Sequence, residues 1–189
     1  MPIPKRYKGY TKGLARALRK GAVGILPTDT LYGLVASALL PDAVRRAYKV
    51  RKRSPRKPSI ILAHSLAGIR LFGVRVSVRE RRVLEKIWPG RVSVILHCSD
   101  KKYRHLHRGG TTLAFRVPAS KALRNFLLVS GPLIAPSANP EGKKPAYSIR
   151  EAERYFGNRV DFYCDKGVLR GKPSTLISIR EGKTVVLRK

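Results

Sequence analysis

Short apolar runs alternate with segments of helical periodicity along the whole chain, and this interleaving is the feature that most constrains the fold. Helical periodicity predicts helices over residues 10–20, 42–51, 66–72, 78–87, 121–129 and 149–156. Apolar runs predict strands over residues 22–26, 59–63, 92–98, 112–117, 133–135, 160–164, 175–179 and 184–187. Two pairs of strands follow one another directly. This order predicts an α/β fold with a twisted, mixed parallel and antiparallel sheet flanked by helices.

One domain is expected over residues 1–189, because no repeat, low-complexity tract or Pro/Gly/Ser linker divides the chain. The most apolar window, residues 21–40, contains Pro27 and Asp29, so it is not predicted to cross a membrane. Cys98 and Cys164 lie far apart without metal-ligand spacing, which predicts two reduced core thiols and no metal site. We therefore expect a cytoplasmic protein.

The charge balance is the abnormal part of the composition. Forty-one Lys and Arg residues against eleven Asp and Glu residues give a formal net charge of +30. Such an excess repels itself unless a polyanion or counterions lie nearby, and RNA phosphates are one such partner. A generally basic, solubilising surface would give the same composition, so the charge alone leaves both interpretations open.

The densest basic run covers the predicted helix 42–51 and the loop after it. Ala43, Val44, Ala47 and Val50 supply a buried side for that helix, so the charges occupy the rest of its surface. The planar fork of arginine suits bidentate phosphate contact, and either a triphosphate or an RNA backbone would fit; a solvated helix face is the alternative. The basic residues of this run are Arg45, Arg46, Lys49, Arg51, Lys52, Arg53, Arg56 and Lys57.

Polar residues follow two of the predicted strands directly. Residues 27–33 read PTDTLYG and residues 135–142 read APSANPEG. Hydroxyl, carboxylate and amide groups at strand ends can hold a small polar ligand, because α/β sheets bind ligands at such edges. The same residue types also form ordinary turns, so each segment by itself fits either role.

Other polar residues carry weaker signals. Arg116 ends a predicted inner strand, where a charge needs an anion or an opening to solvent. Ser174 could face a phosphate or simply start a strand. His105 and His107 lack supporting carboxylates or cysteines, so a metal site is not predicted there. The chain has no Walker A, GxGxxG, HExxH, GxSxG or kinase motif, so any use of ATP requires another way of binding phosphate.

Taken in order, these segments resemble the YrdC/Sua5 family. The matching stretches are GAVGILPTDTLYGL, a basic segment followed by PSIIL, WPGRVSVIL, TTLAFRVP, PLIAPSANPEG and KPSTLISI before VVLRK. They run from about residue 10 to the end of the sequence. The resemblance implies a single YrdC-like domain that forms L-threonylcarbamoyladenylate from L-threonine, bicarbonate and ATP with Mg²⁺, for the t6A modification of tRNA.

The resemblance also implies roles for particular residues, and no side chain is implied as a nucleophile. Threonine would be bound by Thr30, Tyr32, Arg116 and Ser174. ATP would be bound by Arg51, Arg53, Ser137, Asn139 and Arg188. The remaining basic residues of the run are candidates for RNA contact: Arg45, Arg46, Lys49, Lys52, Arg56 and Lys57. The family's KxRPxxxP segment is matched here by residues 51–54, with Arg51 in place of its lysine and Ser54 in place of its proline.

Two other functions are compatible with the same sequence. One is a non-catalytic, YciO-type protein that binds double-stranded RNA, tRNA or ribosome-assembly RNA through its basic surface. The other is a relative that transfers carbamoyl groups using carbamoyl phosphate and ATP. The combination of PTDTLYG, Arg116 and PSAN favours the adenylating enzyme, because gripping a phosphate backbone does not need such a pocket. tRNA and proteins that transfer the threonylcarbamoyl group are expected partners.

Overall fold

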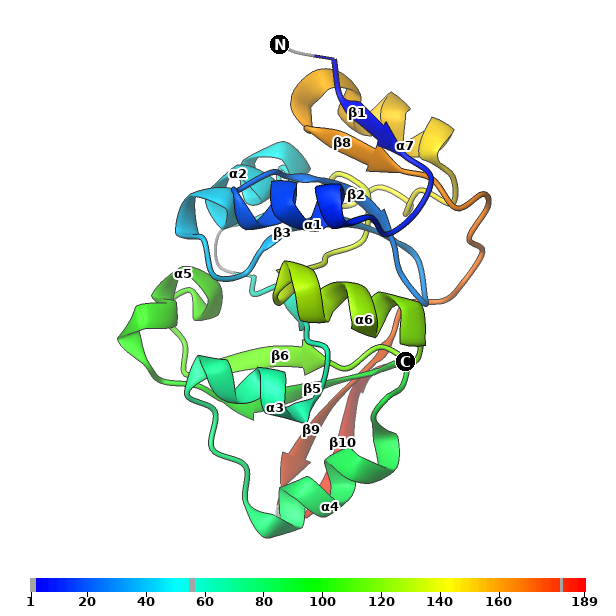
Figure 1. Ribbon diagram of the computed structural model, residues 1–189. Helices are drawn as coiled ribbons and strands as arrows, with labels where there is room; N and C mark the ends of the chain where they lie inside the picture. Colours follow the sequence, from blue (N-terminus) through cyan, green and yellow to red (C-terminus); the bar gives the residue numbers. More distant parts are fainter. Residues whose placement is uncertain (1–2, 55–56, 181) are drawn as a thin grey trace.

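The computed structural model describes residues 3–54, 57–180 and 182–189, which form a mixed sheet with helices on both faces (Figure 1). The sheet has ten strands in the order β1-β8-β2-β3-β7-β4-β6-β5-β9-β10. The strands are β1 (Lys5–Tyr7), β2 (Gly24–Pro27), β3 (Tyr32–Ser37), β4 (Ile60–Leu62), β5 (Val92–His97), β6 (Thr112–Arg116), β7 (Leu133–Ile134), β8 (Phe162–Cys164), β9 (Thr175–Arg180) and β10 (Lys183–Arg188). The predicted α/β class is confirmed.

Parallel and antiparallel pairs alternate irregularly across this sheet. β8 is parallel to β1 and β2, β4 to β6, and β5 to β9, whereas the other neighbouring pairs are antiparallel. The strand direction rotates from the half containing β8 to the half containing β9 and β10, as expected for a twisted sheet (Figure 1). The central strands β2, β3, β7, β4 and β6 carry the polar segments that the sequence singled out.

The helices are α1 (Lys12–Arg19), α2 (Pro41–Arg51), α3 (Leu66–Ile69), α4 (Val78–Ile87), α5 (Arg104–His107), α6 (Lys121–Ser130) and α7 (Ile149–Phe156). Most begin where a side-chain oxygen accepts a hydrogen bond from an otherwise unpaired backbone N–H group. Thr11, Ser120 and Ser148 cap α1, α6 and α7 in this way. Ser77 and Glu80 form a reciprocal capping box at the start of α4. Proline at the first position of α2 fits a helix start for the same reason.

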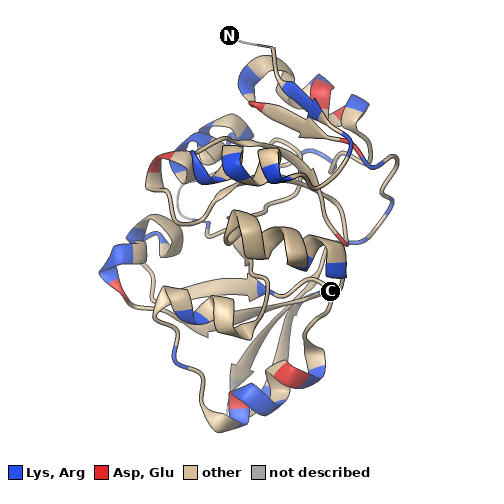
Figure 2. Ribbon diagram, viewed as in Figure 1, with Lys and Arg blue, Asp and Glu red and all other residues tan. Residues whose placement is uncertain are grey.

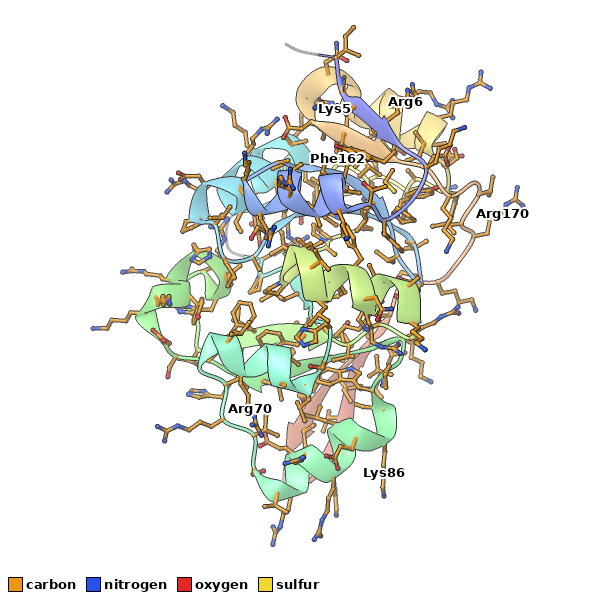
Figure 3. The ribbon with its side chains drawn as sticks, in the orientation of Figure 1. Lys5, Arg6, Arg70, Lys86, Phe162 and Arg170 are labelled. Atoms are coloured by element: carbon orange, nitrogen blue, oxygen red, sulfur yellow. The ribbon has the colours of Figure 1, made fainter. Side chains whose placement is uncertain are left out.

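Two apolar clusters cover the two faces of the sheet. α1 and α6 pack together through Leu14, Leu18 and Leu127 against residues of β2, β3, β4 and β8, among them Phe162, which Figure 3 labels. The other cluster joins α2, α3 and α7 to the opposite side of the strands. The predicted buried side of α2 is confirmed, because Ala43, Val44, Ala47 and Val50 are all at most 8% exposed.

Several described elements lie outside the strands and helices predicted from the sequence. β3 contains Gly33 and Ala36 and is buried along its whole length, so it shows neither alternation nor a run of β-branched residues. β1 is short, basic and mostly exposed, as suits an edge strand. The basic segment around His105 and His107 forms a short 3₁₀ turn, η2 (Lys101–Tyr103), followed by α5. The expected helix 66–72 ends as a second 3₁₀ turn, η1 (Arg70–Phe72).

Both cysteines are buried and unpaired, as expected. Burial in apolar surroundings raises the pKa of the Cys164 thiol to about 11, which keeps it protonated and unreactive at neutral pH. Within the described ranges, every helix is too short or too polar to span a bilayer. Lys and Arg residues recur along α1, α2, α4 and α5, with few Asp and Glu residues among them (Figure 2). Arg70, Lys86 and Arg170 project away from the body (Figure 3).

Two adjacent leucines on α6 test whether its apolar face carries stability. Leu127 is 1% exposed and Leu128 is 66% exposed. We expect Leu127→Ala to lower the free energy of unfolding by about 2–5 kcal/mol, because it leaves a cavity between α6 and the sheet. Leu128→Ala, the matched control, should change it by less than about 0.5 kcal/mol. Urea denaturation measures both; equal effects would contradict this packing.

Candidate functional site

A polar pocket of about 250 Å³ opens where the ends of β2, β6, β7 and α2 meet the starts of β3, β4 and β9. Gly33 pairs with Ser137 across this meeting point, so the two predicted polar segments lie side by side. Four arginines and no acidic residue are among the described residues that line the pocket. The polar and charged side chains in this lining are Thr28, Thr30, Tyr32, Arg51, Arg53, Ser59, Arg116, Ser137, Ser174 and Arg188.

Arg116 lies at the end of β6 with its side chain only 5% exposed. Its Nη2 is 3.1 Å from Oδ1 of the equally buried Asp29, and its Nη1 donates to Thr30 Oγ1 at 3.1 Å. Asp29 Oδ2 in turn accepts from the backbone N–H of Ala119. Burial lowers the pKa of Arg116, and the nearby Asp29 opposes that shift. The anion that the sequence required for Arg116 is therefore supplied partly by Asp29.

The turn between β2 and β3 is organised by hydroxyl groups. Thr28 Oγ1 donates to the carbonyl of Leu31 at 2.6 Å and accepts from the N–H groups of Thr30 and Leu31. The two threonine hydroxyls lie 3.0 Å apart, and Thr30 Oγ1 also accepts from Arg116 Nη1. These contacts hold the Thr30 hydroxyl beside Arg116 in the pocket lining.

Arg51, the last residue of α2, is 6% exposed and reaches the segment after β7. Its Nε donates to the Ser137 carbonyl at 3.1 Å and its Nη2 donates to Ser137 Oγ at 3.2 Å. Burial, followed by the charge of Arg53, lowers the pKa of Arg51 to about 10, so it stays cationic at neutral pH. The buried Arg51 Nη1 and Arg116 Nε have no hydrogen-bond partner in the described part of the chain. Both arginines line the pocket and give it positive charge, which suits an anionic ligand.

The loop after α2 is held by its own contacts. Arg53 Nε donates to the Lys57 carbonyl and its Nη2 donates to the Pro58 carbonyl at 2.7 Å. Tyr48 also donates its hydroxyl to the Lys57 carbonyl and accepts from Ser59 Oγ. The Arg53 guanidinium lies 5.9 Å from the centre of the Tyr48 ring. Arg53 therefore lines the pocket and also donates hydrogen bonds to the backbone carbonyls of its own loop.

Glu141 connects this loop to the segment after β7. Its Oε2 accepts from the Ser54 N–H at 2.6 Å, its Oε1 lies 2.7 Å from Lys57 Nζ, and its backbone N–H donates to the Arg51 carbonyl. The Lys57 hydrogen bond, with the Ser54 N–H, lowers the pKa of Glu141 to about 2. Sequence reasoning did not assign Glu141, although this acid lies two residues after the PSAN segment.

The segment between β8 and β9 passes next to the turn between β2 and β3. Tyr32 donates its hydroxyl to the Gly167 carbonyl at 2.8 Å and accepts from the Lys166 N–H at 2.9 Å. Gly171 packs so closely that a Cβ there would lie 1.9 Å from the Thr30 carbonyl oxygen. The Tyr32 hydroxyl therefore holds the segment between β8 and β9 in place. Other atoms of Tyr32 line the pocket.

The segment between β8 and β9 places Ser174 in the pocket lining, just before β9 begins. Ser174 Oγ lies 2.8 Å from Ser93 Oγ on β5, and the Ser174 carbonyl accepts from Arg188 Nη2 at 3.0 Å. Arg188 comes from β10, so the last strand of the sheet also lines the pocket. This arrangement of four arginines and several hydroxyl groups suits the binding and orientation of an anionic ligand.

Comparisons with known proteins agree with this geometry. The family described as Telomere recombination, Sua5/YciO/YrdC, matches residues 16–189. The threonylcarbamoyl-AMP synthase of Thiobacillus denitrificans is 31% identical over 184 residues, which cover 97% of this chain and 98% of that protein. The chain belongs to the Sua5/YciO/YrdC family. The resemblance read from the sequence is thus confirmed.

Other family members are longer than this chain. The threonylcarbamoyl-AMP synthase of Pyrococcus abyssi is 32% identical over 173 residues, or 90% of this chain, which span about half (51%) of that protein. The crystal structure of Pyrococcus abyssi Sua5 complexed with L-threonine superposes with a TM-score of 0.88 at 28% identity. That match covers 99% of this chain and 57% of the other.

Eight of the nine residues expected at the small-molecule site line one pocket, namely Thr30, Tyr32, Arg51, Arg53, Arg116, Ser137, Ser174 and Arg188. Asn139 is the exception. It is 5% exposed, and its side-chain amide donates to the carbonyls of Pro140 and Lys143. Its position shapes the loop behind Ser137. The binding roles of all nine residues stay predictions.

The described residues among those expected to contact RNA lie on α2 and the following loop, and none of them lines this pocket. Arg45 pairs with Asp42, Arg46 with Asp161 and Lys57 with Glu141. Lys49 and Lys52 are exposed and make no ion pair within the described ranges. Arg56 lies outside the described residues.

Glu141→Gln should loosen the loop that carries Arg53. The folded pKa of Glu141 lies below its ordinary value of 4.5, so its stabilising contribution is fully present above that value and is lost as the pH falls toward about 2. At neutral pH we expect the variant to lose hydrogen-exchange protection at the Ser54 amide severalfold, because an amide oxygen is a weaker acceptor than a carboxylate.

Glu85→Gln is the matched control, because Glu85 pairs with Arg81 on the exposed face of α4. It should leave the Ser54 amide unchanged. An unchanged Ser54 amide in Glu141→Gln would show that the loop is held without this carboxylate.

Proposed function

We propose that this protein forms L-threonylcarbamoyladenylate from L-threonine, bicarbonate and ATP, as a step in t6A modification of tRNA. The observation that carries the proposal is the arginine-lined pocket, in which buried donors of Arg51 and Arg116 have no partner among the described residues. Substrates with a carboxylate and a triphosphate would supply anions for these groups. The family relationship and the relatives named threonylcarbamoyl-AMP synthase support the same activity.

The proposed reaction needs orientation and charge neutralisation more than covalent help from the protein. The threonine nitrogen bonds to the carbon of bicarbonate and water leaves, which gives N-carboxythreonine. Its new carboxylate attacks the α-phosphorus of ATP, the bond from that phosphorus to the bridging oxygen breaks, and pyrophosphate leaves. Both partners are negative, so a cationic site that holds them together lowers the barrier by positioning and electrostatics.

Roles for the pocket residues follow from their positions. Thr30 and Arg116, joined by a hydrogen bond and backed by Asp29, are placed to hold the threonine carboxylate and side chain, together with Tyr32 and Ser174. Arg51, Arg53, Ser137 and Arg188 are placed to hold ATP, and Asn139 supports the Ser137 loop.

Magnesium would enter with ATP. The described residues contain no cluster of three His, Cys, Asp or Glu side chains, and Asp29 beside the pocket is engaged by Arg116 and Ala119. This donor set fits Mg²⁺ held mainly by substrate phosphates, which is a usual arrangement for that ion. Its contribution when bound is to offset phosphate charge.

The partners follow from the product. A mixed anhydride of a carbamate and AMP is reactive, so we propose that it passes to threonylcarbamoyl-transfer proteins acting on tRNA. Two free, buried thiols suit the reducing cytoplasm as the site of this work.

The decisive test is incubation with ATP, Mg²⁺, bicarbonate and L-threonine, followed by measurement of pyrophosphate and of a threonine-containing AMP adduct. Pyrophosphate release should depend on both threonine and bicarbonate. Arg53→Ala should lower kcat/KM for ATP by roughly tenfold or more, because it removes a charged donor from the pocket and frees the loop. Lys12→Ala, an exposed residue at the start of α1, is the charge-matched control. Release that ignores threonine or bicarbonate would refute the activity.

We also propose RNA binding by the exposed basic surface of α2 and α5. The two helices are in contact, and the Arg108 guanidinium at the end of α5 lies 4.0 Å from the centre of the Tyr48 ring on α2. Exposed Lys49, Lys101 and Arg104 make no ion pair within the described ranges, so their charges are available to phosphates.

tRNA affinity measured against salt concentration tests this second function. Replacing Lys49, Lys101 and Arg104 together by alanine should make the log–log salt slope shallower by roughly three, about one for each lost phosphate contact. The control replaces Arg79, Arg82 and Lys86 on α4, which removes the same charge from another surface. Equal effects would indicate non-specific attraction by the net charge.

A further inference from the structure

Ser93 carries a buried hydroxyl next to a residue of the pocket lining, and the proposed function gives it no role. It lies in β5 and is fully buried, whereas Ser174 is 4% exposed and lines the pocket. Their Oγ atoms are 2.8 Å apart, and this is the only side-chain hydrogen bond of Ser93 to the described residues. A buried hydroxyl without a partner costs free energy, so this contact compensates the burial of the Ser93 hydroxyl.

The surrounding strands fix the geometry of this contact. β5 and β9 are parallel neighbours, with Ser93 opposite Leu176 and Val92 opposite Thr175. On its other side β5 pairs with β6, where Val94 lies opposite Phe115. Ser93 therefore sits one position along from that pair, beside Arg116. The Ser174 carbonyl is separately held by Arg188. The strand pairing and Arg188 therefore hold the backbone around Ser174, and the contact with Ser93 orients the Ser174 side chain.

The direction of the hydrogen bond follows from the charge of the pocket. The lining has four arginines and no acid among the described residues, so its ligand presents acceptor oxygens. If Ser174 donated to Ser93, it would turn a lone pair toward those oxygens. If Ser93 donates to Ser174, the Ser174 proton is released for the ligand. The second arrangement satisfies every group, and it makes a relay from Ser93 through Ser174 to the ligand.

We infer that Ser93 is a positioning residue that orients Ser174 as a hydrogen-bond donor to an anionic oxygen of bound L-threonine. This inference rests on the proposed function, because it assigns the ligand of Ser174. Ser93 itself does not line the pocket and acts only through Ser174. It also extends the site to β5, which contributes no lining residue among those described.

The test compares Ser93→Ala, Ser93→Thr, Ser174→Ala and the double variant Ser93→Ala/Ser174→Ala. We expect Ser93→Ala to raise the Kd and KM for L-threonine about 5- to 30-fold, the effect of one misplaced buried hydrogen bond. The KM for ATP and kcat should change less than about twofold. Ser93→Thr, which keeps the hydroxyl, should restore binding. The double variant should bind threonine no worse than Ser174→Ala alone, because Ser93 works through that residue.

Ser178→Ala is the matched control, because Ser178 on β9 carries a buried hydroxyl without a partner among the described residues. Calorimetry with L-threonine and the pyrophosphate assay provide the readouts. An active wild type with an unchanged Ser93→Ala, or additive losses in the double variant, would overturn this inference alone. A wild type that neither binds L-threonine nor releases pyrophosphate would overturn the proposed function and this inference together.

Discussion

The buried pair of Arg116 and Asp29 is the interaction on which the pocket depends. It joins the end of β6 to the turn between β2 and β3, and Asp29 extends the connection to the N–H of Ala119 before α6. Both side chains are 5% exposed, so removing either partner would leave an uncompensated charge in a poorly solvated place. Stability alone does not explain the pair, since an apolar pair of similar volume often serves a core as well. It keeps a cation at the centre of the sheet with one edge of its guanidinium unused.

The other pocket arginines are held in a similar way, because each donates part of its guanidinium group to a neutral acceptor of the protein. Arg51 rests on Ser137, Arg53 on backbone carbonyls and Arg188 on the Ser174 carbonyl. Anchoring removes much of the rotamer entropy that a long side chain would lose on binding. Mutual repulsion and burial oppose this concentration of charge, as the lowered pKa of Arg51 shows. An anionic ligand offsets this repulsion, so the pocket is electrostatically prepared for anions.

Sequence patterns predicted most helices and strands, because caps and apolar periodicity are local signals. β3 escaped prediction since its burial on both sides removes the alternation that marks a strand, and its start lies inside the polar segment PTDTLYG. Local chemistry singled out several of the candidate pocket residues, but their binding roles came only from the order of the motifs, which is a family signal. Ser93 and Glu141 could not be assigned in that way. Their partners, Ser174 and Ser54, are 81 and 87 residues away, and only strand order and loop docking bring them together.

The departure at residues 51–54 has a physical interpretation in this fold. A lysine ammonium at position 51 would be a compact charge with three donors. The Arg51 guanidinium instead uses Nε and Nη2 on the two oxygens of Ser137, and its buried Nη1 has no partner among the described residues. Ser54 replaces a proline, and its N–H is what Glu141 binds at 2.6 Å; a proline there would have no such donor. The two substitutions therefore act in the same direction. Each makes a contact between the region at the end of α2 and the segment after β7. Hydrogen bonds therefore hold this region in place, whereas a proline would restrict its backbone directly.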